Sequence, residues 1–438
     1  MALETEAACL LRTGAQYGRR CGLRRAEGLA FAGLKRGAFS LYFGDDPIFH
    51  YDRQGRWQRI FADGVHYRKS LDNAVDAIDR VRVDASMELR RRSVPFAEAA
   101  DLDATARNVA LELLDDVFRG EAEVVAPPEG VAAIGPDELR STLEAIVGWD
   151  AARWFVHREK YLKAYGPIGF LPPDCHASIV VQSTLGDACG WAFGGASPRE
   201  HAVKTPEEFA RHCRDVAALW GRRATQAKGI YLAGGDALCR PAEEVEATLR
   251  ALSEVFPMAE GDGPRRLQDL PEDLPRFEGV DGWIDDLGGP IVDAEGWSHL
   301  RASGLRRVNL GVESGDSAIR SIVGRNWDDD RARRLVGGLK SGGIAVRVVA
   351  LVGTGGVERA REHVAGTIGL IESLGLARGD LVYLVAAADV GDPTQGGRFT
   401  GLDQASTEVQ RTAIKAGLAE TRDRGAKVVV YSTDKQMV

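Results

Sequence analysis

Three loops of the chain place carboxylates or a thiol directly after short apolar runs. Asp187 and Cys189 follow the run at 178–182, Asp236 follows the run at 229–233, and Glu313 ends the run at 307–312. A carboxylate can pair with an ammonium group or act as a general base, and a thiolate is a nucleophile and a metal ligand. These residue types therefore indicate a polar site built from loops.

Glycines accompany the carboxylates. Gly234 and Gly235 precede Asp236, and Gly353 lies in the turn Gly353-Thr-Gly355-Gly356. Glycine lets a ligand approach the backbone closely, because it has no Cβ. Glu313 ends an apolar strand, where an unpaired charge would be costly, so we expect a ligand or Arg347 to be its partner.

Apolar strands alternate with amphipathic helices from about residue 177 onward. The strands are expected at 178–182, 229–233, 282–284, 307–312, 345–351 and 381–385, and the helices at 206–222, 241–255, 317–322, 331–341 and 360–374. Such alternation predicts a parallel sheet with right-handed crossovers. Six units over roughly 210 residues fit a partial (β/α)6 TIM-like barrel, since a full eight-stranded barrel needs about 250.

The rest of the chain forms two further regions. Short strands at 39–44, 48–51 and 57–61, followed by helices at 103–118 and 136–147, predict an N-terminal α+β domain over 1–170. The barrel is expected over 171–395. Residues 396–438 should form a helix and a strand that pack on it. The fold class is therefore α/β with an N-terminal α+β domain.

Composition limits the classes of molecule that the protein is expected to bind. The net charge of -8 and the pI near 5.6 argue against general nucleic-acid binding. No apolar run is long enough to cross a membrane, so we predict a cytoplasmic protein with a small-molecule substrate, and a protein partner or homodimer stays open. The six cysteines are scattered without CxxC spacing and should be free thiols.

The loop from Gln182 to Gly195 resembles the cluster-binding loop of the radical S-adenosylmethionine (SAM) superfamily. Thr184, Gly186 and Phe193 fit the frame of that loop, whose three cysteines hold a 4Fe-4S cluster. In this chain the three cysteine positions of the CxxxCxxC motif are occupied by Asp187, Trp191 and Gly194. Cys189 is out of frame, so we expect no 4Fe-4S cluster and no metal site.

The likeness extends over about residues 175–395 and implies a SAM site. Gly234-Gly235-Asp236 is similar to the motif that receives the amino group of SAM, and Glu313-Ser314 resembles the segment that reaches its ribose and methionyl groups. Arg347, Gly353 and Val385 occupy positions that the resemblance places beside the adenine. Asp187 and Cys189 are the candidate catalytic groups. Phe49-His50-Tyr51-Asp52 with Gly55-Arg56 also looks like the leading domain of one radical SAM subgroup.

Three functional hypotheses follow. The first is an enzyme that binds SAM without a cluster and uses it in polar chemistry, namely methyl or aminocarboxypropyl transfer, cyclisation or elimination. The second is a non-catalytic pseudoenzyme or partner protein, and the third is a true radical SAM enzyme with atypical cluster ligands. The glycine turn at 353–356 is also compatible with dinucleotide binding, but Glu358 stands where that fingerprint needs Gly or Ala.

Overall fold

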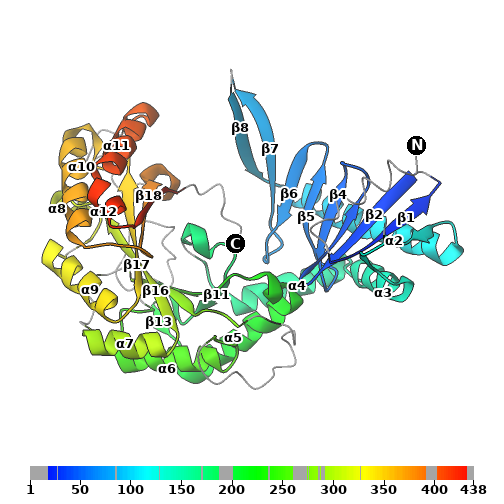
Figure 1. The fold of residues 1–438 in the computed structure, drawn as a ribbon, viewed down its shortest axis with the longest axis horizontal. Coiled ribbons are helices and arrows are strands. Elements are labelled where there is room, and N and C mark those ends of the chain that lie inside the picture. Colours follow the sequence, from blue (N-terminus) through cyan, green and yellow to red (C-terminus); the bar gives the residue numbers. More distant parts are fainter. Residues whose placement is uncertain are drawn as a thin grey trace.

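The computed structural model describes most of the chain. The described residues are 18–26, 28–83, 86–127, 129–168, 171–186, 201–234, 237–259, 274, 276–284, 287, 292–325, 327–390 and 402–431. Two lobes are visible in Figure 1, an N-terminal sheet with helices and a second sheet surrounded by helices.

The N-terminal lobe contains a ten-stranded sheet in the order β10-β1-β2-β3-β4-β5-β6-β7-β8, with β9 paired to β1. β1 to β8 form an antiparallel meander, as short turns between consecutive strands favour. The bounds are β1 Arg19–Arg25, β2 Gly28–Lys35, β3 Ala38–Tyr42, β4 Ile48–Asp52, β5 Trp57–Ala62, β6 Val65–Lys69, β7 Val75–Val83, β8 Ser86–Ser93, β9 Glu123–Val125 and β10 Ala132–Ala133.

Three helices complete this lobe: α2 (Phe96–Arg119), α3 (Pro136–Val147) and α4 (Ala151–Ala164). α2 ends at Gly120, whose left-handed φ of 71° suits glycine, and Asp150 caps α4 through the backbone N–H of Arg153. Alternate residues of the strands pack with the apolar sides of α2 and α3 in one buried core. One face of the sheet is therefore covered by helices.

The second lobe is built on a seven-stranded parallel sheet in the order β11-β14-β15-β16-β17-β18-β19. Its strands are β11 Ile179–Gln182, β14 Ile230–Ala233, β15 Val280–Ile284, β16 Leu305–Glu313, β17 Ala345–Val352, β18 Leu381–Ala386 and β19 Lys427–Val430. The helices are α5 Pro206–Trp220, α6 Ala242–Ser253, α7 Ala294–Ala302, α8 Ser317–Ile322, α9 Asp329–Ser341, α10 Gly356–Ser373, α11 Gln404–Gly417 and α12 Ala419–Asp423. Short elements are β12 Thr184–Leu185, β13 Ala202–Val203, η1 Pro173–Cys175, η2 Gly221–Gln226 and η3 Ala387–Val390.

The predicted fold class, a partial α/β barrel preceded by an α+β domain, is confirmed. All six expected barrel strands are present as β11 and β14 to β18. The sheet has a seventh strand, because β19 pairs in parallel with β18 and so continues the sheet instead of packing on its outside. No helix of the described part of the chain combines the length and apolar character that crossing a bilayer requires.

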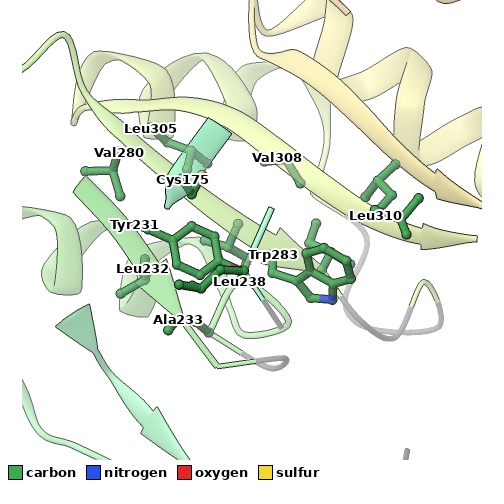
Figure 2. Close-up of a cluster of buried hydrophobic side chains, with 14 of the residues drawn as sticks. Cys175, Tyr231, Leu232, Ala233, Leu238, Val280, Trp283, Leu305, Val308 and Leu310 are labelled. Atoms are coloured by element: carbon green, nitrogen blue, oxygen red, sulfur yellow. The ribbon is translucent and has the colours of Figure 1, made fainter. Parts of the chain in front are cut away.

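Large side chains from neighbouring strands fill the interior of this lobe. Figure 2 shows Tyr231, Trp283 and Leu310, from β14, β15 and β16, within one buried cluster. Leu238, which follows β14, packs on Gly282, where a Cβ would lie 2.5 Å from the leucine Cδ1. Glycine at 282 thus lets the loop after β14 lie flat on β15.

The two lobes are joined by a buried arginine. The Arg56 guanidinium donates to the carbonyl oxygens of Leu219 and Trp220, both at 2.6 Å, at the end of α5. Its Nε donates to Asp52 at 2.5 Å, so charge and hydrogen bonds are both matched. Gly55, with φ of 89°, lies so close to Ala145 that a Cβ would be 2.4 Å from its carbonyl oxygen. Arg56, oriented by Asp52, therefore links the two lobes, whereas Gly55 packs on α3 within the first lobe.

We predict that Arg56→Ala destabilises the protein by about 3–5 kcal/mol, because it leaves Asp52 as an unpaired buried charge and two carbonyls without donors. Urea denaturation measures this cost. Arg250→Ala is the control, since Arg250 is 68% exposed, bonds only Glu246 and should change stability by less than about 0.5 kcal/mol. Equal stability of the two variants would contradict the role assigned to Arg56.

Candidate functional site

The carboxyl ends of the parallel strands meet at one edge of the barrel, where polar loops of this fold class converge. Gly234 follows β14, Glu313 ends β16, Gly353 follows β17 and Val385 lies at the end of β18. These four predicted residues share this edge. Several residues named from the sequence lie outside the described residues: Asp187, Cys189, Trp191, Phe193, Gly194, Gly235 and Asp236.

Gly234 lies directly against Thr184. Its φ is 110°, and a Cβ would be 2.2 Å from Thr184 Oγ1. Thr184 begins β12, which pairs with β13 and so folds the loop after β11 back toward the strand end. Glycine is required at this position both by the backbone conformation and by the close approach of Thr184.

Glu313 is held by an arginine. Its two carboxylate oxygens accept from Nε and Nη2 of Arg325 at 3.1 and 3.0 Å, and the two side chains are 2% and 3% exposed. Glu313 also has a left-handed φ of 55°, which is uncommon for a residue other than glycine and marks a constrained turn. The prediction that Glu313 has a buried partner is correct, but that partner is Arg325 and not Arg347.

Ser314 braces the same turn. Its fully buried hydroxyl lies 2.7 Å from His363 Nδ1 and accepts from the backbone N–H of Asp316 at 3.0 Å. Because His363 Nε2 bonds the carbonyl oxygen of Leu351, Nδ1 is left to accept from Ser314. The side chain that the sequence assigned to ligand binding thus has a structural partner on α10.

The turn also depends on Gly315. A Cβ at Gly315 would lie 2.0 Å from the carbonyl oxygen of Gly366, so the turn and helix α10 touch backbone to backbone. Asp316, next in the chain, pairs with Arg359 of the same helix. The turn that carries Glu313 is therefore fixed by its contacts with α10.

Arg347 lies toward the other end of the strands. It stands opposite Asn309, four residues before Glu313 along β16, and pairs with Asp281 at 3.3 Å and with Asp174. Arg307 joins Asp281 at 2.9 Å. Arg347 was predicted to bind SAM. Its guanidinium is engaged by these carboxylates in the structure, and the binding role stays a prediction.

The same charged group holds a cysteine and a tyrosine. The thiol of Cys175 donates to Asp281 at 3.4 Å, and the Tyr383 hydroxyl donates to Asp174 at 2.7 Å. Burial, together with the two aspartates, raises the pKa of Cys175 far above its usual range. Cys175 is therefore a protonated structural thiol.

Gly353 and Val385 have different surroundings. Gly353 has φ of 80°, and its backbone N–H donates to Gln410 of α11 at 2.5 Å. Val385 is fully buried and stands opposite Leu351 of β17. A ligand at this edge could reach the backbone of both strands, whereas the side chain of Val385 serves the core.

Three hydroxyl oxygens near these strand ends are buried and have no hydrogen-bond partner among the described residues. They are Ser183 Oγ and Thr184 Oγ1, after β11, and Thr354 Oγ1, after β17. A buried polar atom without a partner costs about 1–3 kcal/mol, so such atoms indicate a missing ligand or water. The sequence reasoning missed these residues, although hydroxyl residues directly after an apolar strand were visible as a signal.

A 4Fe-4S cluster does not fit the side chains that this loop offers. Such a cluster takes thiolates from several cysteines, and the loop from 182 to 195 contains one, Cys189. Elsewhere in the described chain Cys21, Cys175 and Cys213 are buried, and burial raises the pKa of each thiol. We therefore derive no chemical step from a cluster.

Comparison with known proteins identifies structural similarity to radical SAM enzymes. Coproporphyrinogen III oxidase (HemN) from Escherichia coli is 14% identical with a TM-score of 0.38, over 60% of this chain and 61% of its own. SuiB from Streptococcus suis, bound to S-adenosylmethionine, is 12% identical with a TM-score of 0.40, over 86% and 73%. The radical S-adenosylmethionine methyltransferase TsrM from Kitasatospora setae is 16% identical with a TM-score of 0.33, over 50% and 39%.

The chain thus spans less than two thirds of the length of HemN and TsrM. No family model and no curated protein matches the sequence. What the chain does has to be inferred from its own residues.

We predict that Arg325→Ala destabilises the protein by about 3–5 kcal/mol, because Glu313 keeps a buried charge without a partner. Adding Glu313→Gln to this variant should recover part of the loss, since the charge is removed. Urea denaturation reports both effects. Arg333→Ala removes an exposed arginine that pairs with Asp330 and serves as the control. A loss below about 1 kcal/mol in Arg325→Ala would show that the pair does not hold the turn.

Two buried histidines predict acid sensitivity of this edge. Burial is the main cause that lowers the pKa of His363 and of His212 to about 4. His212 Nε2 accepts from the backbone N–H of Gln182, so protonation would break that bond, as it would the Ser314 bond of His363. The stabilisation is complete above the unfolded pKa of about 6.5 and is lost as pH falls toward 4.

Each histidine should then contribute up to about 1.4 kcal/mol per pH unit to the loss of stability in this window. The free energy of unfolding, measured by urea denaturation at several values between pH 7.5 and pH 5, tests this slope. His212→Gln should be less stable at neutral pH but should show a shallower decline. A free energy that does not change over this range would refute the assignment.

Proposed function

We propose that the chain is an enzyme that binds SAM at the carboxyl ends of its barrel strands and uses it in polar chemistry without a cluster. The observation that carries this proposal is a set of buried hydroxyls near the glycines at 234 and 353. Ser183, Thr184 and Thr354 find no hydrogen-bond partner in the part of the chain that the structure describes. SAM has ribose hydroxyls, a purine and an aminocarboxyl group, which can supply such partners. Glycine gives them access to the backbone.

Different residues of this chain would contact different parts of SAM. Gly234 and Gly235 would admit the aminocarboxyl group with Asp236 as partner of the ammonium, and the turn of Glu313 would face the ribose. Gly353 and Val385 would present backbone groups to the adenine. Glu313 already accepts from Arg325, so its carboxylate has a fixed position before any ligand arrives, which lowers the ordering cost of binding.

The chemistry that bound SAM supplies is a sulfonium that activates its three carbon substituents toward nucleophiles. The chain's part is to position an acceptor and exclude water, because correct orientation alone is worth several kcal/mol. Asp187 is the candidate to accept a proton from the nucleophile, and Cys189 is the candidate anchor. Methyl transfer, aminocarboxypropyl transfer, cyclisation and elimination are all compatible with these roles.

Replacing one hydroxyl separates a binding role from a structural role. We predict that Thr184→Val weakens SAM binding about tenfold, which corresponds to one hydrogen bond of about 1.4 kcal/mol, while stability stays equal or rises. A merely structural threonine would show the opposite, a loss of stability with unchanged affinity. Isothermal titration with SAM and S-adenosylhomocysteine, and thermal denaturation, measure the two effects.

Thr142→Val is the matched control, because Thr142 is on α3 and donates to the Glu138 carbonyl oxygen. It should leave SAM affinity unchanged. Absence of binding of both ligands at millimolar concentration would defeat the proposal. Near-stoichiometric iron and sulfide in protein purified without oxygen would overturn its cluster-free part and favour a radical enzyme with atypical ligands.

A further inference from the structure

The N-terminal sheet has two chemically different faces. Residues such as Phe49, Ile60 and Ala77 are buried in one core with residues of α2 and α3. Strand residues alternate between the faces, so their neighbours point to the opposite side. That side, over β4 to β8, carries seven basic side chains in the described part of the sheet, which we call the cationic face: His50, Arg59, His66, Arg68, Arg80, Arg82 and Arg91.

The pairing register brings like charges together. His50 stands directly opposite Arg59, and Arg59 directly opposite Arg68, so three basic residues form one row across β4, β5 and β6. Directly opposed like charges destabilise a sheet by roughly 0.2–1 kcal/mol per pair. Asp76, which continues the row on β7, forms an ion pair with Arg91. The row therefore retains a net positive charge.

The close spacing of these basic groups affects their pKa values. Burial lowers the pKa of His66, and Arg68, Arg80 and Arg59 lower it further. Burial is also the first cause that lowers the pKa of Arg68, followed by the charges of Arg59 and Arg91. His66, Arg59 and Arg80 are exposed to solvent. The positive charge is thus spread over the cationic face, and the exposed side chains make it accessible to a partner.

An apolar row runs beside the basic row. Ile48, Phe61 and Ile78 are half-buried, and they share the register line of His66, whose ring lies 4.5 Å from that of Phe61. The two rows are two residues apart along each strand, which is about 7 Å. A partner that matches both rows needs negative charge along one edge and apolar groups along the other.

We propose that the cationic face binds an acidic, amphipathic polypeptide segment, with its carboxylates against Arg59 and Arg68 and its aliphatic side chains against Phe61 and Ile78. Charge complementarity selects the anion, because this face is basic in a protein of net charge -8. Arginine guanidinium groups bind carboxylates in a bidentate manner. The proposal concerns a different part of the chain from the SAM site and does not depend on it.

A nucleic acid fits this face less well. At neutral pH, where His66 and His50 are deprotonated, five arginines remain on this face, and one of them, Arg91, pairs with Asp76. Proteins that bind duplexes tightly make about 6–10 phosphate contacts. An acidic segment needs fewer ion pairs and uses the apolar row.

The test measures binding and stability of the full chain together. The probe is a short fluorescein-labelled peptide that repeats glutamate and leucine, followed by fluorescence anisotropy at low salt, with a glutamine-for-glutamate peptide and labelled oligothymidine as alternative probes. The variant is Arg59→Gln with Arg68→Gln. Its matched control is Arg119→Gln with Arg140→Gln, which replaces two exposed arginines on α2 and α3.

We expect the glutamate peptide to bind, with an affinity that falls at least about tenfold in Arg59→Gln/Arg68→Gln and stays unchanged in the control. Thermal stability of the double variant should be equal or higher, because like-charge repulsion is relieved. No binding of the peptide, equal binding of the glutamine peptide, or unchanged affinity in the double variant would each overturn the proposal. Tighter binding of oligothymidine that is lost in the same variant would assign the face to nucleic acid instead.

Discussion

Asp281 is the charge on which the architecture of the barrel depends. It is 3% exposed, and its carboxylate accepts from Arg307, Arg347 and Cys175, which come from β16, β17 and the segment before β11. A buried carboxylate is tolerated only when its charge and its lone pairs are matched, so these strands must hold one mutual arrangement. The ionic group also occupies the amino end of the interior. Polar groups at the carboxyl end are consequently the ones left to meet a ligand.

Much of the barrel could be predicted from the sequence because its strands are short apolar runs with β-branched residues. β19 was not expected as a member of the sheet, since it has only four residues, and three of them are half-buried or exposed valines. The extent of the N-terminal sheet was also missed. Strand β7 largely alternates apolar and charged residues over Val75–Val83, which is a strand pattern, yet no strand was predicted there.

The candidate site could be predicted in part. The glycines at 234 and 353 have the left-handed φ that the turn pattern required, and Glu313 is buried with a partner. The ion-pair partner of Glu313 could not be predicted, because no spacing rule favours Arg325 over Arg347. Only the three-dimensional arrangement shows which arginine reaches the carboxylate. The partner of Ser314 could not be predicted either. A hydroxyl after a strand can bond a ligand or a neighbouring helix, and the sequence pattern is the same in both cases.

The arginine that joins the lobes has a consequence for how the molecule can be divided. Arg56 satisfies the last carbonyls of α5, a helix that packs on β11 and α6 in the barrel and on α4 in the first lobe. Hydrogen bonds therefore cross the boundary that the sequence suggests near residue 170. A barrel separated from the first lobe would expose two acceptors at a helix end that water must then solvate. The two lobes look like separate modules in the sequence. Chemically, however, the first lobe supplies the hydrogen bonds that complete a helix end of the second.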